Sequence, residues 1–108
     1  MAIDFSKLTN TKVKAAIDAL QKGDAKAWFP LFAADVILYD DGNQMHFNNF
    51  FKKALGKEKF TSIDKVENNG LDVYGHFHSN QWGDFETNFK FQINKDGKIS
   101  RLDISPSL

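Results

Sequence analysis

The sequence contains no cysteine and carries no net charge, and each absence removes a class of function. Without cysteine there is no disulfide framework, no thiol nucleophile and no thiolate metal site. The fourteen basic and fourteen acidic residues balance, so no long-range field draws the chain to nucleic acid or to an anionic membrane. No apolar run approaches the roughly 20 residues of a membrane span, and the first residues lack the pattern of a signal peptide. We therefore expect a cytoplasmic protein.

Phenylalanine is the residue that the sequence has in excess. Eleven phenylalanines stand against two tyrosines and two tryptophans in 108 residues, a length typical of one domain. Phenylalanine supplies a large apolar area without a polar tip that needs a partner. The rings either fill a core or line a cavity for a flat organic ligand, and the composition leaves both interpretations open.

The first third of the chain predicts two consecutive helices. Residues 13–20 place their apolar side chains on one stripe of a helix, and Gly23 suits the left-handed position that ends it. Asp24 can cap a second helix, whose apolar face contains Trp28, Leu31 and Phe32. Pro30 lies too deep in this second helix, so we expect it to bend or restart the helix.

A hydrophobic strand and a third helix follow. The strand at 36–39 leads into a turn, then into a short alternating piece at 45–47. The third helix is predicted over 50–55, with Asn48 or Asn49 as its cap. These segments complete the helical half of the chain.

The second half of the chain has the two-residue period of strands. An Asn-Gly hairpin turn at 68–70 separates a first strand, from about residue 61, from a second at 71–78. Further strands are predicted at 85–93 and 99–104. Helices segregated from strands indicate an α+β fold, with the helices covering one face of a curved, mostly antiparallel sheet in a single domain that spans the whole chain.

Three segments at 17–24, 31–42 and 91–99 carry a family resemblance through their order and spacing. On them the chain resembles the nuclear transport factor 2-like superfamily, in its SnoaL-like and ketosteroid-isomerase-like branch. The resemblance implies a cystatin-like α+β fold, a cone-shaped roll in which helices roof a pocket inside a bent sheet. It implies no single function, because enzymes, binding domains and scaffolds share this fold.

The resemblance also implies one catalytic position. Asp40 lies where the isomerase-type enzymes keep the carboxylate that moves a proton beside a ketone. The positions of their two oxyanion donors correspond to Ala16 and Phe89, which donate no hydrogen bond, so a steroid isomerase is not indicated. Read from the residues alone, Asp40 is either a buried base with a raised pKa or part of a solvated turn, and a slip of one residue would exchange it for Asp41.

We predict catalytic roles for Asp40 and His46, the latter either as a partner of Asp40 or as an exposed strand histidine. The leading hypothesis is a small apolar or aromatic ligand in the pocket, with isomerase- or cyclase-like proton transfer. The alternative is a non-catalytic dimeric binding or accessory domain with a filled core, so the residues leave open whether the chain is an enzyme. The predicted lining residues are Ala16, Leu20, Trp28, Phe32, Leu38, Phe47, Phe51, Phe77, Phe89, Phe91 and Leu102.

Tyr74, His76 and His78 share the outer face of the predicted strand at 71–78. A His-x-His pair can ligate a metal with Asp72 or Glu86, but a dimer contact is the better interpretation, so we expect a homodimer and neither a metal nor another cofactor. Trp82 belongs to a loop, where it either closes the rim of a pocket or lies at a dimer edge. The partners expected are thus a small molecule and a second copy of the chain, and neither nucleic acid nor a membrane.

Overall fold

The structure is a computed structural model that describes residues 3–106 of the chain. Its helical segments are η1 (Phe5–Lys7), α1 (Thr11–Lys22), α2 (Ala25–Trp28), η2 (Phe29–Leu31) and α3 (Phe47–Ala54). Its strands are β1 (Phe32–Asp40), β2 (Asn43–Met45), β3 (Glu58–Glu67), β4 (Asp72–Ser79), β5 (Gly83–Ile93) and β6 (Ile99–Pro106).

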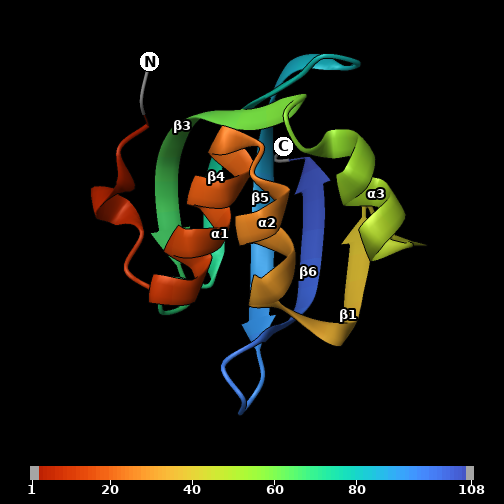
Figure 1. Cartoon of the computed structure of the whole chain (residues 1–108). Coiled ribbons are helices and arrows are strands. Elements are labelled where there is room, and N and C mark those ends of the chain that lie inside the picture. The colour runs from red at the N-terminus through yellow and green to blue at the C-terminus, as the bar shows by residue number, and fades with distance from the viewer. Residues whose placement is uncertain (1–2, 107–108) are drawn as a thin grey trace.

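The strands form one six-stranded sheet in the order β2-β1-β6-β5-β4-β3 within the described residues. All neighbouring pairs are antiparallel except β1 and β6, which run parallel. The helices α1 and α2 lie across one face of the sheet, and α3 lies beside the end of β1 (Figure 1). The predicted α+β class, with helices on a mostly antiparallel sheet, is confirmed.

The helix α1 has the start and the end that its sequence predicts. The Asn10 side chain accepts hydrogen bonds from the backbone N–H groups of Lys12 and Val13, at 3.0 and 3.1 Å. At the other end Gly23 has a φ of 64°, a left-handed conformation that costs glycine little.

The chain leaves the second helix earlier than the sequence suggested. The helix α2 ends at Trp28, and Pro30 lies in the short 3₁₀ segment η2. Proline has no backbone N–H to continue the helical hydrogen bonds, so the predicted bend occurs here. Phe32, predicted on this helix, is instead the first residue of β1, a strand predicted to begin only at residue 36.

Two more boundaries differ from the prediction. The helix α3 is capped by His46, whose Nδ1 accepts the backbone N–H of Asn49 at 3.3 Å, so Asn48 and Asn49 lie inside the helix. An unprotonated ring nitrogen accepts a hydrogen bond as the side-chain oxygen of asparagine does. The strand β3 begins at Glu58, three residues before the predicted start, because its pairing with β4 already begins there.

The central strands alternate as their sequences predict. In β4, Val73, Gly75 and Phe77 are buried, whereas Tyr74 is partly exposed and His76 is exposed on the outer face. In the next strand, β5, the predicted inner residues Thr87, Phe89 and Phe91 are buried and Phe85 and Ile93 are half-buried. Asn88, predicted on the outer face, is buried as well. None of the helices described in residues 3–106 is long and apolar enough to cross a membrane.

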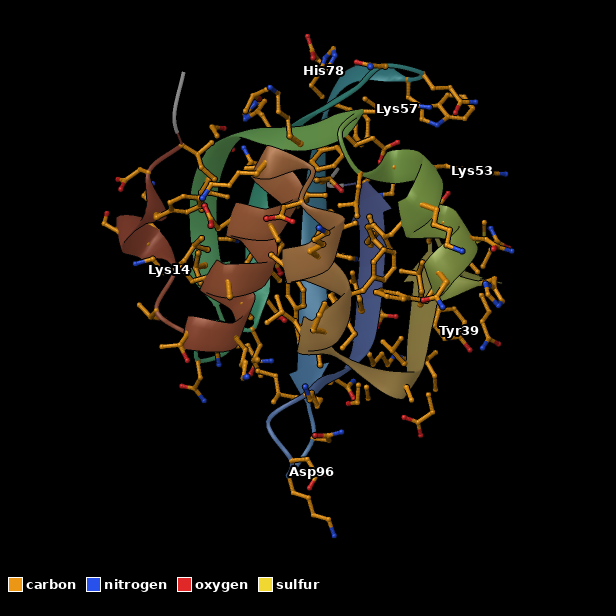
Figure 2. The ribbon with its side chains drawn as sticks, in the orientation of Figure 1. Lys14, Tyr39, Lys53, Lys57, His78 and Asp96 are labelled. Carbon is orange, nitrogen blue, oxygen red and sulfur yellow. The ribbon has the colours of Figure 1, made fainter. Side chains whose placement is uncertain are left out.

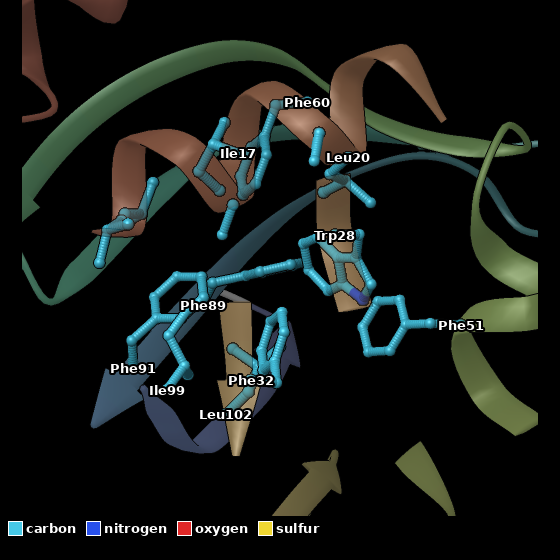
Figure 3. Packing of buried hydrophobic residues seen from close by; sticks show 14 of the residues in the cluster. Ile17, Leu20, Trp28, Phe32, Phe51, Phe60, Phe89, Phe91, Ile99 and Leu102 are labelled. Carbon is cyan, nitrogen blue, oxygen red and sulfur yellow. The ribbon is translucent and has the colours of Figure 1, made fainter. Parts of the chain in front are cut away.

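Aromatic rings from α2, β1 and α3 fill the core beneath α2. The ring of Trp28 has no exposed surface and lies 4.7 Å from that of Phe32 and 4.6 Å from that of Phe51, between centroids. Phe89 and Phe91 of β5 continue this core below α1 (Figure 3). The interior is therefore solid at this end of the sheet.

Candidate functional site

A pocket lies at the opposite end of the sheet, below α3. It is built where β1, β4 and β6 end and where β3 and β5 begin, and its volume is about 1180 Å³. Its apolar walls include the rings of Phe50, Phe51, Phe77, Trp82, Phe85 and Phe89. Pockets for drug-sized ligands measure roughly 300–1,000 Å³, so the space accommodates such a molecule.

Asp40 is the last residue of β1 and lines this pocket. Its side chain is half-buried, and this burial raises the pKa of the carboxyl group, to which the neighbouring charge of Asp41 adds. Asp41 also lines the pocket but is exposed, with its backbone N–H donating to the carbonyl of Ile104 at 2.8 Å. Of the two acids, Asp40 is thus the better enclosed.

Glu58 is a second half-buried carboxylate in the same pocket. It begins β3 directly opposite Ser79, the last residue of β4, whose hydroxyl donates to Glu58 Oε2 at 3.1 Å. Burial raises the pKa of Glu58; the hydrogen bond from Ser79 acts against that shift, and the charge of Asp40 adds to it. The pocket therefore contains two half-buried carboxyl groups, and the charge of Asp40 raises the pKa of Glu58.

The Ser79 hydroxyl also organises the rim of the pocket. Its oxygen accepts the backbone N–H groups of Gln81 and Trp82, both at 3.2 Å. This ties the turn between β4 and β5 to the wall that carries Glu58. Trp82 lines the pocket with 71% of its surface exposed, so its ring is available to a ligand.

His46 lies on the α3 side of the pocket and is exposed. Its Nδ1 accepts the N–H of Asn49, so the neutral ring carries its proton on Nε2. The capping contact fixes the ring at the start of the helix. The structure thus brings Asp40 and His46 to one pocket, with no hydrogen bond between them in the described part of the chain.

The predicted lining residues divide into two groups. Leu20, Phe51, Phe77 and Phe89 line the pocket. The structure places the others in the hydrophobic core instead, and of these Phe47 also borders a second, smaller hollow beside Val36 and Met45. These core residues are Ala16, Trp28, Phe32, Leu38, Phe47, Phe91 and Leu102.

The two outer-face histidines engage different carboxylates. His76 Nδ1 lies 2.9 Å from Asp64 Oδ2, and its Nε2 lies 3.5 Å from Glu86 Oε1. His78 Nδ1 lies 2.6 Å from Asp84 Oδ1, a hydrogen bond that raises the pKa of His78. The two imidazoles are thus not arranged as joint ligands. A potential metal-ligand set on this face consists of Asp64, His76 and Glu86, all exposed and with ligand atoms within 4.8 Å of one another.

Glu58 and Ser79 are the site residues that sequence reasoning missed. Glu58 lies between two lysines, in a stretch without apolar alternation, so it was not assigned to a strand. The sequence feature that predicts the position of Glu58 is its spacing from Phe60, because residues two apart on a strand share a face. A buried Phe60 then implies that Glu58 points to the same side.

The chain is similar in architecture to several solved structures. An NTF2-like protein of unknown function from Cytophaga hutchinsonii has 15% identity, with 99% of this chain and 93% of that chain covered and a TM-score of 0.74. A candidate polyketide cyclase from Sinorhizobium meliloti has 21% identity, with 88% and 94% covered and a TM-score of 0.70.

The Orange Carotenoid Protein of Anabaena (Nostoc) sp. PCC 7120, solved with canthaxanthin bound, has 17% identity and a TM-score of 0.74. The match covers 96% of this chain but only 38% of that one. No protein-family model and no curated protein matches the sequence. The structural matches agree with the resemblance carried by the sequence, and the chain has the nuclear transport factor 2-like, cystatin-like fold.

Proposed function

We propose that this protein binds a small molecule with an apolar or aromatic body in the pocket below α3. The observation that carries the proposal is the pocket itself, about 1180 Å³ of space walled by aromatic rings. A filled interior, the alternative reading of the phenylalanine content, would leave only voids near the size of a water molecule. Neighbours named as carotenoid-binding or as candidate polyketide cyclases support a ligand of this kind.

Proton transfer is a second candidate function, and the half-buried Asp40 favours it. A carboxylate with a raised pKa is a better base towards an acidic proton of a bound ligand, and its conjugate acid can return that proton. Ala16 and Phe89 offer no hydrogen bond to a developing oxyanion, so the largest electrostatic contribution of a ketone isomerase is missing. We therefore rank binding above chemistry.

The test is a screen of planar ketones and aromatic acids by thermal shift, with amide NMR spectra of the positive compounds. A ligand of the pocket should raise the melting temperature and shift signals of Phe77, Trp82 and Phe89 rather than those of the solid core. Phe77→Ala should weaken binding, and Phe91→Ala, in the core, serves as a control for lost stability. If no compound stabilises the fold, the proposal fails.

The catalytic step has its own readout. A ligand proton that Asp40 removes and returns should exchange with deuterium from the solvent, which NMR detects on the bound compound. Asp40→Asn should abolish that exchange even at ligand concentrations that saturate the variant, because the amide cannot take up the proton. Exchange that survives this substitution would contradict the role of Asp40.

A further inference from the structure

The charges around the pocket are unevenly placed. Six titratable side chains line it: Asp40, Asp41, His46, Lys53, Lys57 and Glu58. Only the two carboxylates Asp40 and Glu58 are partly buried, whereas the other four side chains are exposed. The charges held inside the pocket are thus both acidic, and the basic groups lie at its mouth.

Within residues 3–106, neither inner carboxylate has a cationic partner. Among the ion pairs of residues 3–106, none involves Asp40, Glu58, Lys53 or Lys57. Lys53 extends away from α3 into solvent (Figure 2). A carboxylate withdrawn from water is stabilised by a counter-charge, and no lysine, arginine or histidine of residues 3–106 forms an ion pair with either of these half-buried groups.

Aromatic rings complete the chemistry of the pocket. Phe77 and Phe85 lie 5.8 Å apart between centroids on its wall, and the exposed ring of Trp82 forms part of its rim. The negative face of an aromatic ring attracts a cation, and tryptophan is the strongest of the three aromatic side chains in this respect. Aromatic rings and carboxylates without an ion-pair partner, together in one pocket, are complementary to a ligand that is both apolar and cationic.

We propose that the ligand is an organic cation, in which an apolar or aromatic body carries a protonated amine or quaternary nitrogen that contacts Asp40 and Glu58. This inference rests on the proposed binding function and adds the ligand's charge to it. A carboxylate ligand would meet two like charges inside the pocket. A neutral ketone would leave both inner carboxylates without a counter-charge.

Binding of an organic cation should be coupled to the protonation of the two inner carboxyl groups. A bound cation favours the ionised forms of Asp40 and Glu58, so binding should release protons and should strengthen as the pH rises through the titration of these two groups.

The experiment compares three probes with one skeleton and different charge: phenylbutylamine, phenylbutanol and phenylbutyrate. Calorimetry on the full chain near neutral pH should give an affinity for the amine at least about tenfold above that for the alcohol. Glu58→Gln, which can still accept the Ser79 hydrogen bond, should remove most of this preference without changing the alcohol's affinity. Glu67→Gln makes the same change at the far end of β3, outside the pocket, and should leave the preference intact.

Each outcome has a defined meaning. Equal affinities for the amine and the alcohol, or tightest binding by the acid, would overturn the cation proposal and leave the binding function standing. Binding of none of the three probes would count against both. Should Glu58→Gln fail to fold, Asp40→Asn provides the same comparison, and an unchanged amine preference in a folded variant would also overturn the proposal.

Discussion

At the scale of single residues, Ser79 connects the fold to the pocket. It is buried, its hydroxyl donates to Glu58, and its oxygen accepts two backbone N–H groups of the turn that carries Trp82. One oxygen thus positions both a carboxylate and the rim of the pocket.

Replacing Ser79 by alanine should therefore destabilise the protein and alter the pocket. Two N–H groups lose their acceptor, which costs about 1–3 kcal/mol in the free energy of unfolding. The charged form of Glu58 loses a donor, so the pKa of this carboxyl should rise further. Urea unfolding and a carbon-detected NMR titration measure the two effects.

Ser100→Ala is the matched control, because the Ser100 hydroxyl only donates to the carbonyl of Gln92 and supports no N–H group. It should change the free energy of unfolding by less than about 0.5 kcal/mol. Equal losses in the two variants would show that the Ser79 network contributes nothing.

Asp40 predicts a second effect, on the pH dependence of stability. Its pKa is raised in the folded protein, so between the unfolded and the folded pKa the folded state binds more protons, and stability falls as the pH rises through that range. Asp40→Asn removes this loss. Near neutral pH the variant should be more stable than the parent by less than about 1 kcal/mol, because the half-exposed group is screened by solvent.

The gain from Asp40→Asn should vanish well below the ordinary pKa of a carboxyl group, where both states are protonated. Asp96→Asn, in the exposed turn between β5 and β6, is the control and should give no gain at any pH (Figure 2). Thermal unfolding across the pH range measures both. If the stability difference between the parent protein and Asp40→Asn were the same at every pH, burial of the Asp40 charge would be ruled out.

At the scale of elements, the pairing of β3 with β4 determines where Glu58 lies. The register between these strands shifts twice, between Phe60 and Ser62 and between Ile63 and Lys65. Gly75 lies opposite these irregularities, and a Cβ atom at this position would be 2.1 Å from the carbonyl oxygen of Ser62. Only glycine allows the two backbones to approach so closely.

Gly75→Ala should consequently force the strands apart. The clash is with backbone, which cannot rotate away, so we expect a loss of about 3 kcal/mol in the free energy of unfolding. Gly83→Ala provides the comparison: no atom lies within 4 Å of its Cβ, and its φ of 81° alone makes alanine unfavourable. That variant should lose about 1 kcal/mol, and urea unfolding that gave the two variants the same loss would refute the steric argument.

The elements differ in how far the sequence predicts them. Local signals suffice for α1, whose cap and stop residues are Asn10 and Gly23, and for β5, whose sequence alternates between apolar and polar side chains. The start of β3 at Glu58 depends on pairing with β4, which no local pattern encodes. The cap of α3 was missed because histidine is an uncommon residue in that role.

The same distinction applies to the candidate site. Asp40 could be found because it ends a hydrophobic strand and matches a family position. The sequence does not predict whether a given phenylalanine belongs to the core or to the pocket, because this depends on which rings pack around Trp28. Phe51 shares in both, touching Trp28 and lining the pocket.

At the scale of the whole molecule, the sheet is open and offers two edges and an outer face to a second copy of the chain. The edge of β3 is partly blocked by Lys7, which donates to the carbonyl of Ile63 at 3.2 Å, and the edge strand β2 has only 3 residues. The outer face lies around Tyr74, His76 and His78. A charge placed along an edge strand opposes strand addition, so the outer face is the surface to test.

The predicted homodimer through that face remains a prediction, and the structure defines its expected character. The Lys65 ammonium lies 4.4 Å from the centre of the Tyr74 ring, and His76 lies between two acidic groups. An interface rich in such charges should be weak and sensitive to salt. We expect sedimentation at micromolar concentration to detect a dimer that Tyr74→Glu dissociates. Trp82→Glu, at the rim of the pocket, should leave it intact, whereas a monomeric parent protein would exclude this use of the outer face.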